Sequence, residues 1–205
     1  MKERELIIAA KTLSKVFNPF YLPIVGLIIL FLFTYLNLLP TKYKLMVLAI
    51  VYICTVLLPN LLIRMYRNHQ GWTLFDLGRK ERRMVPYLIS ILCYTLCYYF
   101  MYRLHIPHFM NSIIVAALGI QLLCAIINIY WKISSHSAAI GGMTGALVAF
   151  SGIFNFNPVF WLCFLLFIAG LVGTSRIILR QHSLSQVVFG FLLGVVIGFI
   201  SIWKL

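Results

Sequence analysis

Seven apolar segments dominate this sequence, and each is long enough, or nearly long enough, to cross a bilayer as a helix. A spanning helix needs about 17 to 25 predominantly apolar residues. Prolines stand at several of the joints between the segments, where proline disturbs a helix least. The pattern predicts an all-α, polytopic transmembrane helix bundle of about six to seven spans. The segments are residues 20–39, 43–63, 86–102, 109–131, 137–154, 158–175 and 184–203.

Composition and the remaining segments agree with a membrane protein. Hydrophobic residues make up 62% of the 205 positions and charged residues only 10%, which excludes an ordinary soluble domain. We expect one integral membrane domain over residues 1–205, with a basic loop at 64–85. Residues 1–18 predict a short interfacial helix, because a charged start is followed by an apolar and basic stretch without a signal-peptide cleavage site.

The charge balance is strongly basic, with 17 Lys and Arg against 4 Asp and Glu and a net charge of +13. Such an excess indicates nucleic acid, anionic lipid headgroups or a phosphate-bearing substrate as the partner. Short loops on a membrane chain argue against nucleic acid. Membrane lipids and a lipid phosphate therefore remain as the expected partners, and the sequence is silent on oligomeric state.

Three polar clusters fall on one side of the membrane when the seven segments alternate in direction. They are residues 64–85, 132–137 and 175–185, and the N-terminal tail joins them. This side carries 13 of the 17 basic residues, so the positive-inside rule predicts that it is cytoplasmic. When the candidate ligand-binding cations are left out, the balance is six against four in the same direction. We expect an inner, cytoplasmic-type bacterial membrane as the location.

Cysteines and carboxylates do not indicate a metal centre. All five cysteines lie in apolar segments, and we interpret them as small hydrophobic residues of a helix bundle. Cys93 and Cys97 are one helical turn apart, but no histidine or third thiol accompanies them. The four acids are too few for a hydrolytic metal site, so the sequence predicts no metal and no other cofactor.

Glycines recur at every fourth position of the last segment, at Gly190, Gly194 and Gly198. Gly141, Gly142 and Gly145 form a similar small face on the fifth. Small faces let helices pack closely in lipid, so we interpret both as packing surfaces within the chain, with dimerisation as the alternative.

Two histidines stand at helix starts beside other polar groups. His136 follows Ser134 and Ser135 where the fifth segment begins, and Lys132 lies just before them. Serines are good helix caps, and the N–H groups of a helix start bind anions. An ordinary capped helix with an interfacial histidine explains the same residues.

The second cluster begins at Ser175 and Arg176 and ends at the start of the last segment. His182 and Gln186 are four residues apart, so they share a helix face, and the glutamine carbonyl can accept a hydrogen bond from the ring. Arg176 can grip a phosphate with a bidentate fork. An oriented histidine nucleophile, a second histidine as acid and an arginine clamp suit phosphoryl transfer. Positive flanks on a helical hairpin are the structural alternative.

The spacing of this second cluster resembles a motif of the type 2 phosphatidic acid phosphatase superfamily. The family's third motif reads Ser-Arg-x5-His-x3-Asp, and the chain has Ser175-Arg176, His182 and Gln186 at these positions. The second motif, Pro-Ser-Gly-His, resembles residues 133–136, with Ile133 and Ser135 where Pro and Gly are usual. Two helices between the motifs also fit the family plan.

The resemblance implies a role for each matching residue. His182 would attack phosphorus and form a phosphohistidine, and His136 would protonate the leaving alkoxide and then activate water. Arg176 and the groups around Ser134 and Ser135 would stabilise the phosphoryl oxygens, with Lys132 nearby. The first motif, Lys-x6-Arg-Pro, does not occur in standard form. Its nearest match is residues 79–86, where Arg79 and Arg83 are assigned to phosphate contact and Lys80 and Arg82 are alternatives.

These observations predict a metal-independent membrane phosphatase that acts on a lipid phosphomonoester or diphosphate. Phosphatidylglycerophosphate, phosphatidic acid and isoprenyl diphosphates are the expected substrate classes. Gln186 in place of Asp orients His182 but does not electrostatically favour its charged form. The alternative is therefore an inactive or transport-type relative that binds anionic headgroups without turnover. A lipid transferase is disfavoured by the scarcity of carboxylates.

Overall fold

The computed structural model describes residues 3–71 and 84–204, and within these ranges the chain is helical and has no strands. Seven helical stretches of this described part are long and apolar enough to cross a membrane. The predicted all-α bundle is therefore confirmed. The α-helices are α1 (Glu3–Val16), α2 (Leu22–Phe33), α3 (Thr41–Tyr52), α4 (Leu58–His69), α5 (Met84–Arg103), α6 (His108–Tyr130), α7 (Ser135–Phe154), α8 (Val159–Ile178) and α9 (Leu184–Trp203).

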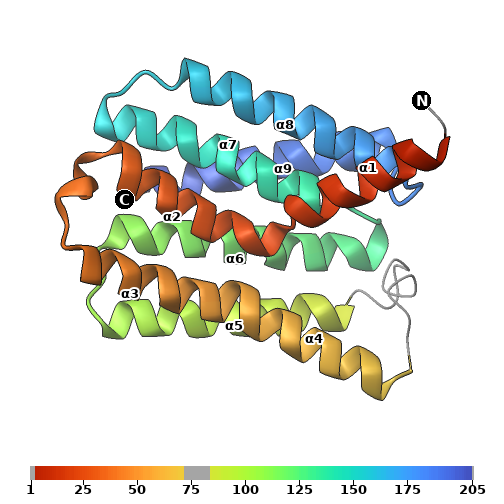
Figure 1. The fold of residues 1–205 in the computed structure, drawn as a ribbon, viewed down its shortest axis with the longest axis horizontal. Coiled ribbons are helices and arrows are strands. Elements are labelled where there is room, and N and C mark those ends of the chain that lie inside the picture. Colours follow the sequence, from red (N-terminus) through yellow and green to blue (C-terminus); the bar gives the residue numbers. More distant parts are fainter. Residues whose placement is uncertain (1–2, 72–83, 205) are drawn as a thin grey trace.

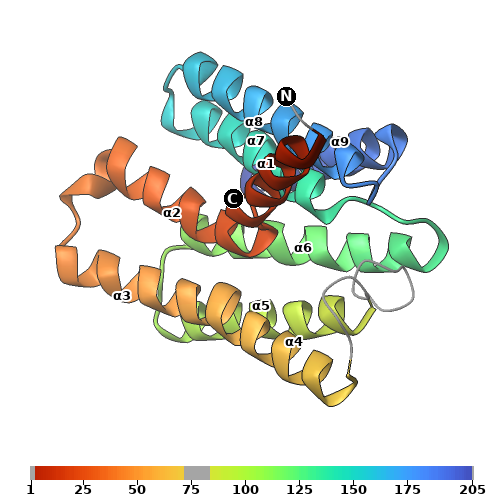
Figure 2. The same ribbon diagram turned by 45° about the vertical axis from the view of Figure 1, so that its right-hand side comes forward.

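The N-terminal helix α1 is short and amphipathic and ends before a break in the chain. Ala10 is buried, whereas Lys11 and Lys15 are exposed, so one face packs and the other is polar. Asn18 caps the short 3₁₀ helix η1 (Pro19–Tyr21) by accepting a hydrogen bond from the Phe20 N–H at 3.2 Å. The break turns the chain into α2, and α1 lies along α8 (Figures 1 and 2).

The first two predicted segments differ from the structure at their ends. The segment 20–39 contains α2 and then a separate 3₁₀ helix, η2 (Tyr35–Leu38), which Thr34 caps through its hydroxyl at 3.3 Å from the Leu36 N–H. The segment 43–63 is part of a longer continuous helix, Thr41–His69, made of α3, a π-helical turn η3 (Ile53–Leu57) and α4.

The expected start of the basic loop at residue 64 is therefore wrong, because residues 64–69 are helical. Arginine is a good helix former, so the arrival of Arg64 and Arg67 changes the polarity of the helix without ending it. The helix ends just before Gly71, which has φ +66° and supplies the left-handed conformation that commonly closes a helix. The predicted end of the loop at residue 85 is wrong as well, because α5 begins at Met84, and residues 72–83 lie outside the described residues.

The C-terminal three helices hold the two motif regions at one end of the bundle. In the chain, α8 follows α7 and runs in the opposite direction before α9 begins. Helices α7 and α9 therefore run parallel and begin at the same end of the bundle (Figure 1). The ends of α4, α6 and α8, and the start of α5, gather there as well, and α1 lies beside them (Figures 1 and 2). The predicted gathering of polar clusters on one side is thus confirmed for the described residues.

Helices α7 and α9 make the closest helix pairing in the described part of the chain, and glycines make it possible. A Cβ atom on Gly194 would collide with the Ala138 carbonyl oxygen, and one on Gly198 would collide with the Gly142 carbonyl oxygen. From α7, a Cβ on Gly145 would collide with the Val195 carbonyl oxygen. We call this contact the glycine seam. The interpretation of both glycine faces as packing surfaces within the chain is confirmed, since backbone meets backbone along the seam.

Candidate active site

His182 lies in the turn between α8 and α9, and Gln186 holds it in position. The Nδ1 atom of His182 is 3.2 Å from Oε1 of Gln186, as the four-residue spacing predicted. His182 is only 6% exposed. An amide oxygen only accepts hydrogen bonds, so this contact places a proton on Nδ1 and leaves the lone pair of the neutral ring on Nε2.

Gln186 also caps the helix on which it stands. Its Oε1 accepts a hydrogen bond from the Ser183 N–H at 3.2 Å, while the Ser183 hydroxyl accepts one from the Gln186 N–H at 3.4 Å. This reciprocal arrangement is a capping box. One side-chain oxygen therefore fixes both the start of α9 and the tautomer of His182, and the two functions are mechanically coupled.

The segment before α7 is built around Ser134. Its hydroxyl caps the helix by accepting from the Ser137 N–H at 3.3 Å and also lies 2.9 Å from the Ser137 hydroxyl. Ser134 is fully buried, so in this arrangement its hydroxyl serves the helix cap. Ser135, the first residue of α7, is partly exposed. Lys132 precedes this cap at the same end of the bundle and is also partly exposed.

His136 reaches α1 instead of remaining within its own helix. Its Nε2 atom is 3.2 Å from the main-chain oxygen of Ser14. The Ser14 hydroxyl in turn lies 3.1 Å from the hydroxyl of Ser175, which donates to the Val172 carbonyl at 2.7 Å. Ser14 therefore links the second-motif histidine to the first residue of the third motif.

Arg176 occupies the last turn of α8 and is 6% exposed, which is unusual for a cation. The chain then doubles back, because Arg180 adopts a left-handed conformation with φ 51° and the Gln181 N–H donates to the Arg176 carbonyl at 3.1 Å. This tight turn carries the chain from Arg176 to His182 at the start of α9. A buried guanidinium in the turn that leads into the start of α9 favours an anion near this position.

The two motif regions meet directly through the backbone. The Ser134 N–H donates to the Gln186 carbonyl at 3.4 Å. Gly190, one turn further along α9, lies so close to the Ser134 carbonyl that a Cβ atom would be 2.8 Å from its oxygen. The structure thus brings together the segments that carry His136, Arg176 and His182.

The predicted residues of the first motif, Arg79 and Arg83 with their alternatives Lys80 and Arg82, lie outside the described residues. Helix α4 ends, and α5 begins, at the same end of the bundle as the start of α9 (Figure 1).

The contact between Ser14 and His136 was not predicted from the sequence. Ser14 lies in the segment predicted to be an interfacial helix, 122 positions before His136, and no motif marks it. Among residues 3–71 and 84–204, no group of three His, Cys, Asp or Glu side chains is placed to hold a metal ion. Of the cysteines, Cys163 is exposed, and the buried ones are Cys54, Cys93, Cys97 and Cys124.

The comparisons with known proteins match the C-terminal part of this arrangement. The family model of the PAP2 superfamily matches residues 125–205, which include His136, Arg176, His182 and Gln186. No curated protein and no solved structure matches the chain.

Proposed function

We propose that this chain is a membrane lipid phosphatase, because the family model of the PAP2 superfamily, whose members are generally phosphatases, matches residues 125–205. It hydrolyses a phosphomonoester or diphosphate headgroup, in the class of phosphatidylglycerophosphate, phosphatidic acid or isoprenyl diphosphate. The observation that carries the proposal is the contact between His182 and Gln186, because it orients a buried histidine so that Nε2 can act as the nucleophile.

The proposed reaction has two steps. Nε2 of His182 attacks phosphorus, a P–N bond forms, and the P–O bond to the lipid alkoxide breaks while His136 supplies the proton of the lipid alcohol. Water then attacks the phosphohistidine, the P–N bond breaks, and the proton of that water passes to His136. Arg176 and the N–H groups at the start of α7 stabilise the charge on the phosphoryl oxygens.

Cationic side chains take the electrostatic role in this proposal, without a metal ion. The chain carries 17 Lys and Arg but only 4 Asp and Glu, so it is rich in phosphate ligands and poor in magnesium ligands. We place the site at the cytoplasmic face of an inner membrane, on the charge asymmetry described above.

A second candidate function is supported by Gln186. The superfamily motif has an acid at this position, and a neutral amide gives no electrostatic support to a positively charged His182. Glutamine in place of the acid favours a second function, in which the protein binds anionic lipid headgroups without turnover.

Phosphate release separates the two functions. Purified protein in detergent with EDTA is expected to release phosphate from short-chain lipid phosphates, and His182→Ala is expected to abolish that release. His108→Ala, at the opposite end of the bundle, serves as the matched histidine control and should retain activity. If neither wild type nor His182→Ala releases phosphate from any substrate class, the phosphatase proposal is contradicted and the non-catalytic function is favoured.

A further inference from the structure

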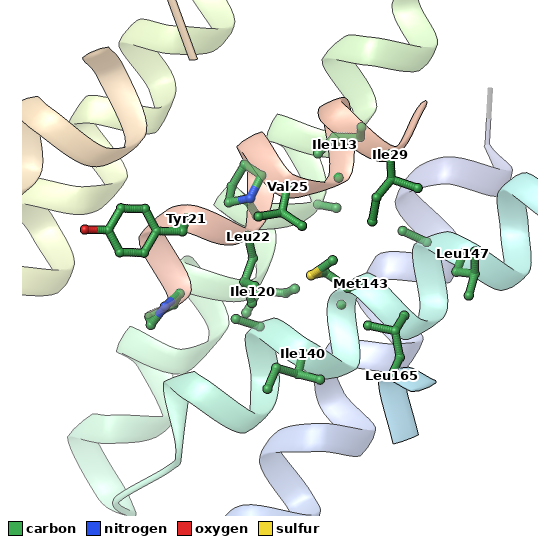
Figure 3. A pocket seen from close by; sticks show the side chains of 18 of the residues that line it. Tyr21, Leu22, Val25, Ile29, Ile113, Ile120, Ile140, Met143, Leu147 and Leu165 are labelled. Atoms are coloured by element: carbon green, nitrogen blue, oxygen red, sulfur yellow. The ribbon is translucent and has the colours of Figure 1, made fainter. Parts of the chain in front are cut away.

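An apolar cavity of about 450 Å³ lies inside the bundle next to the candidate active site. Its walls come from α2, α6, α7 and α8, and Figure 3 shows their apolar side chains around it, among them Leu22, Ile120, Met143 and Leu165. A cavity of this size in a protein interior is unusual, because interiors are close-packed. The described structure therefore contains room for a ligand in a place that packing normally fills.

One end of the cavity reaches the second motif. Ser135, which directly precedes His136, lines it, and so do Val16, the last residue of α1, and Phe17, which follows it. On α7 the lining continues from Ser135 to Phe150, which is about 22 Å at 1.5 Å per residue. The cavity is thus long, and one end of it lies beside the residues proposed to hold phosphate.

The outer side of the cavity faces the membrane. Besides Val16 near the phosphate end, three of its lining residues, Tyr21, Val25 and Phe164, are exposed on the surface, with exposed fractions of 37%, 36% and 50%. They belong to η1, α2 and α8, so the opening lies between α2 and α8. Because the surface between membrane-spanning helices borders the hydrocarbon layer, this opening suits an apolar ligand that enters from that layer.

We propose that this cavity binds a single hydrocarbon chain of a lipid phosphate and selects the chain by length. The proposal rests on the proposed function for its headgroup end, since the phosphate is placed at the site of His136 and His182. A cavity of about 150 Å³ holds one benzene ring, so about 450 Å³ holds on the order of 18 carbon atoms. That is enough for one long acyl or isoprenyl chain and too little for two.

Residues on one face of α7 measure the chain. Ala139, Met143 and Ala146 line the cavity at increasing distance from Ser135, at about 6, 12 and 16 Å along the helix axis. A phenyl group at 139 blocks the cavity near the phosphate, whereas one at 146 removes only its distal part. Val148 lies on the same helix, is exposed, and does not line the cavity.

The test is the binding of alkyl phosphonates, whose P–C bond is not hydrolysed, so that no turnover is needed. Octyl, dodecyl, hexadecyl and eicosyl phosphonate are titrated into the purified protein by calorimetry. Each buried methylene contributes about fourfold in affinity at most. We expect affinity to rise with length and to level off near hexadecyl.

The variants give the decisive comparison. Ala146→Phe is expected to weaken hexadecyl phosphonate by about 10-fold or more and octyl phosphonate by less than about 2-fold. Ala139→Phe weakens all lengths, and Val148→Phe, the matched control, weakens none. Met143→Ala enlarges the cavity and moves the plateau towards eicosyl, so it keeps the test valid if a phenylalanine variant fails to fold.

Farnesyl phosphonate distinguishes the source of the chain. If it binds more tightly than hexadecyl phosphonate, the chain is isoprenyl, and the reverse order identifies an acyl chain. An identical length dependence in wild type, Ala146→Phe and Val148→Phe overturns the proposal. If the protein binds phosphonates by chain length but releases no phosphate, the phosphatase proposal fails and the cavity proposal stands. The failure of one proposal can therefore be distinguished from the failure of the other.

Discussion

His136 and Ser14 are joined across 122 positions of the chain, with Nε2 of the imidazole 3.2 Å from the Ser14 main-chain oxygen. The contact makes α1 part of the candidate active site, although α1 lies outside the matched segment 125–205. With its proton on Nε2, a neutral His136 has its lone pair on Nδ1. The orientation of the proposed acid therefore depends on where α1 sits.

A disulfide can test this placement of α1. The hydroxyl oxygens of Ser14 and Ser175 are 3.1 Å apart, so the variant Ser14→Cys, Ser175→Cys is expected to cross-link on oxidation in a background with Cys163→Ser. Nonreducing electrophoresis and mass spectrometry detect the bond, and the oxidised protein should still release phosphate. Thr12→Cys with Ser175→Cys is the control, because Thr12 is exposed. Equal cross-linking of both pairs contradicts the described position of α1.

Gln186 offers a test of how His182 is oriented. Gln186→Glu keeps the side-chain length and both hydrogen bonds but adds a negative charge that stabilises the imidazolium. We expect turnover at least equal to that of wild type, with the acidic limb of the pH–rate profile moved to higher pH. Gln186→Leu removes the contact and is expected to lower kcat about 100-fold. Because both variants also touch the helix cap, thermal unfolding is measured alongside. If Gln186→Leu has a normal kcat, Gln186 does not orient His182 for the reaction.

Arg176 is expected to require its guanidinium. Arg176→Lys retains the positive charge but loses the planar fork that grips two phosphate oxygens. We expect kcat/KM for a lipid phosphate to fall by about 10-fold or more. Arg180→Lys is the matched change four residues away, in the turn, and should have a small effect. Similar losses in both variants point to general charge instead of bidentate binding.

The glycine seam predicts unequal effects from the same substitution. Gly194→Ala forces a Cβ against the Ala138 carbonyl and is expected to destabilise the protein by about 1 to 3 kcal/mol. Gly170→Ala meets no atom within 4 Å and gains helix propensity, so its stability should be equal or higher. Thermal unfolding in detergent measures both. If Gly194→Ala is as stable as Gly170→Ala, the helices do not pack this closely.

Sidedness is tested with two cysteines at opposite ends of the bundle. His69 ends α4 at the end that holds His182, and Asn155 lies in the loop after α7 at the other end (Figure 1). In a Cys163→Ser background, an impermeant thiol reagent should label Asn155→Cys in intact cells and His69→Cys only in inverted vesicles. Labelling of His69→Cys from outside intact cells overturns the cytoplasmic placement.

The sequence predicted the C-terminal helices more accurately than the N-terminal ones. From residue 84 onwards the helix ends lie within about three residues of the expected ends, because prolines, asparagines and serines mark the boundaries. Around residue 64 the prediction failed, because the first charged residues were taken to mark the end of the helix. The helix is amphipathic there and continues to His69. The shortness of α2 was also missed, as an apolar run does not distinguish an α-helix from a 3₁₀ turn.

The candidate site divides in the same way. The contact of His182 with Gln186 was predictable because it lies within one helical turn. The motifs predicted that the segments of Ser134 and Gln186 lie near each other, but not the hydrogen bond between them. That bond depends on the parallel packing of α7 and α9. The contact of Ser14 with His136 depends on how α1 folds back on α8, which no local pattern reveals.

The glycine seam has a consequence for how such a protein can diverge. His136 and His182 belong to segments that are held in register by backbone packing of α7 against α9, so these two helices set the spacing of the two histidines, while α1 contributes to the orientation of His136. A substitution in α2 or α6 can therefore reshape the cavity wall without moving the two histidines apart. The lipids that the protein accepts can change in this way while the proposed reacting groups keep their places.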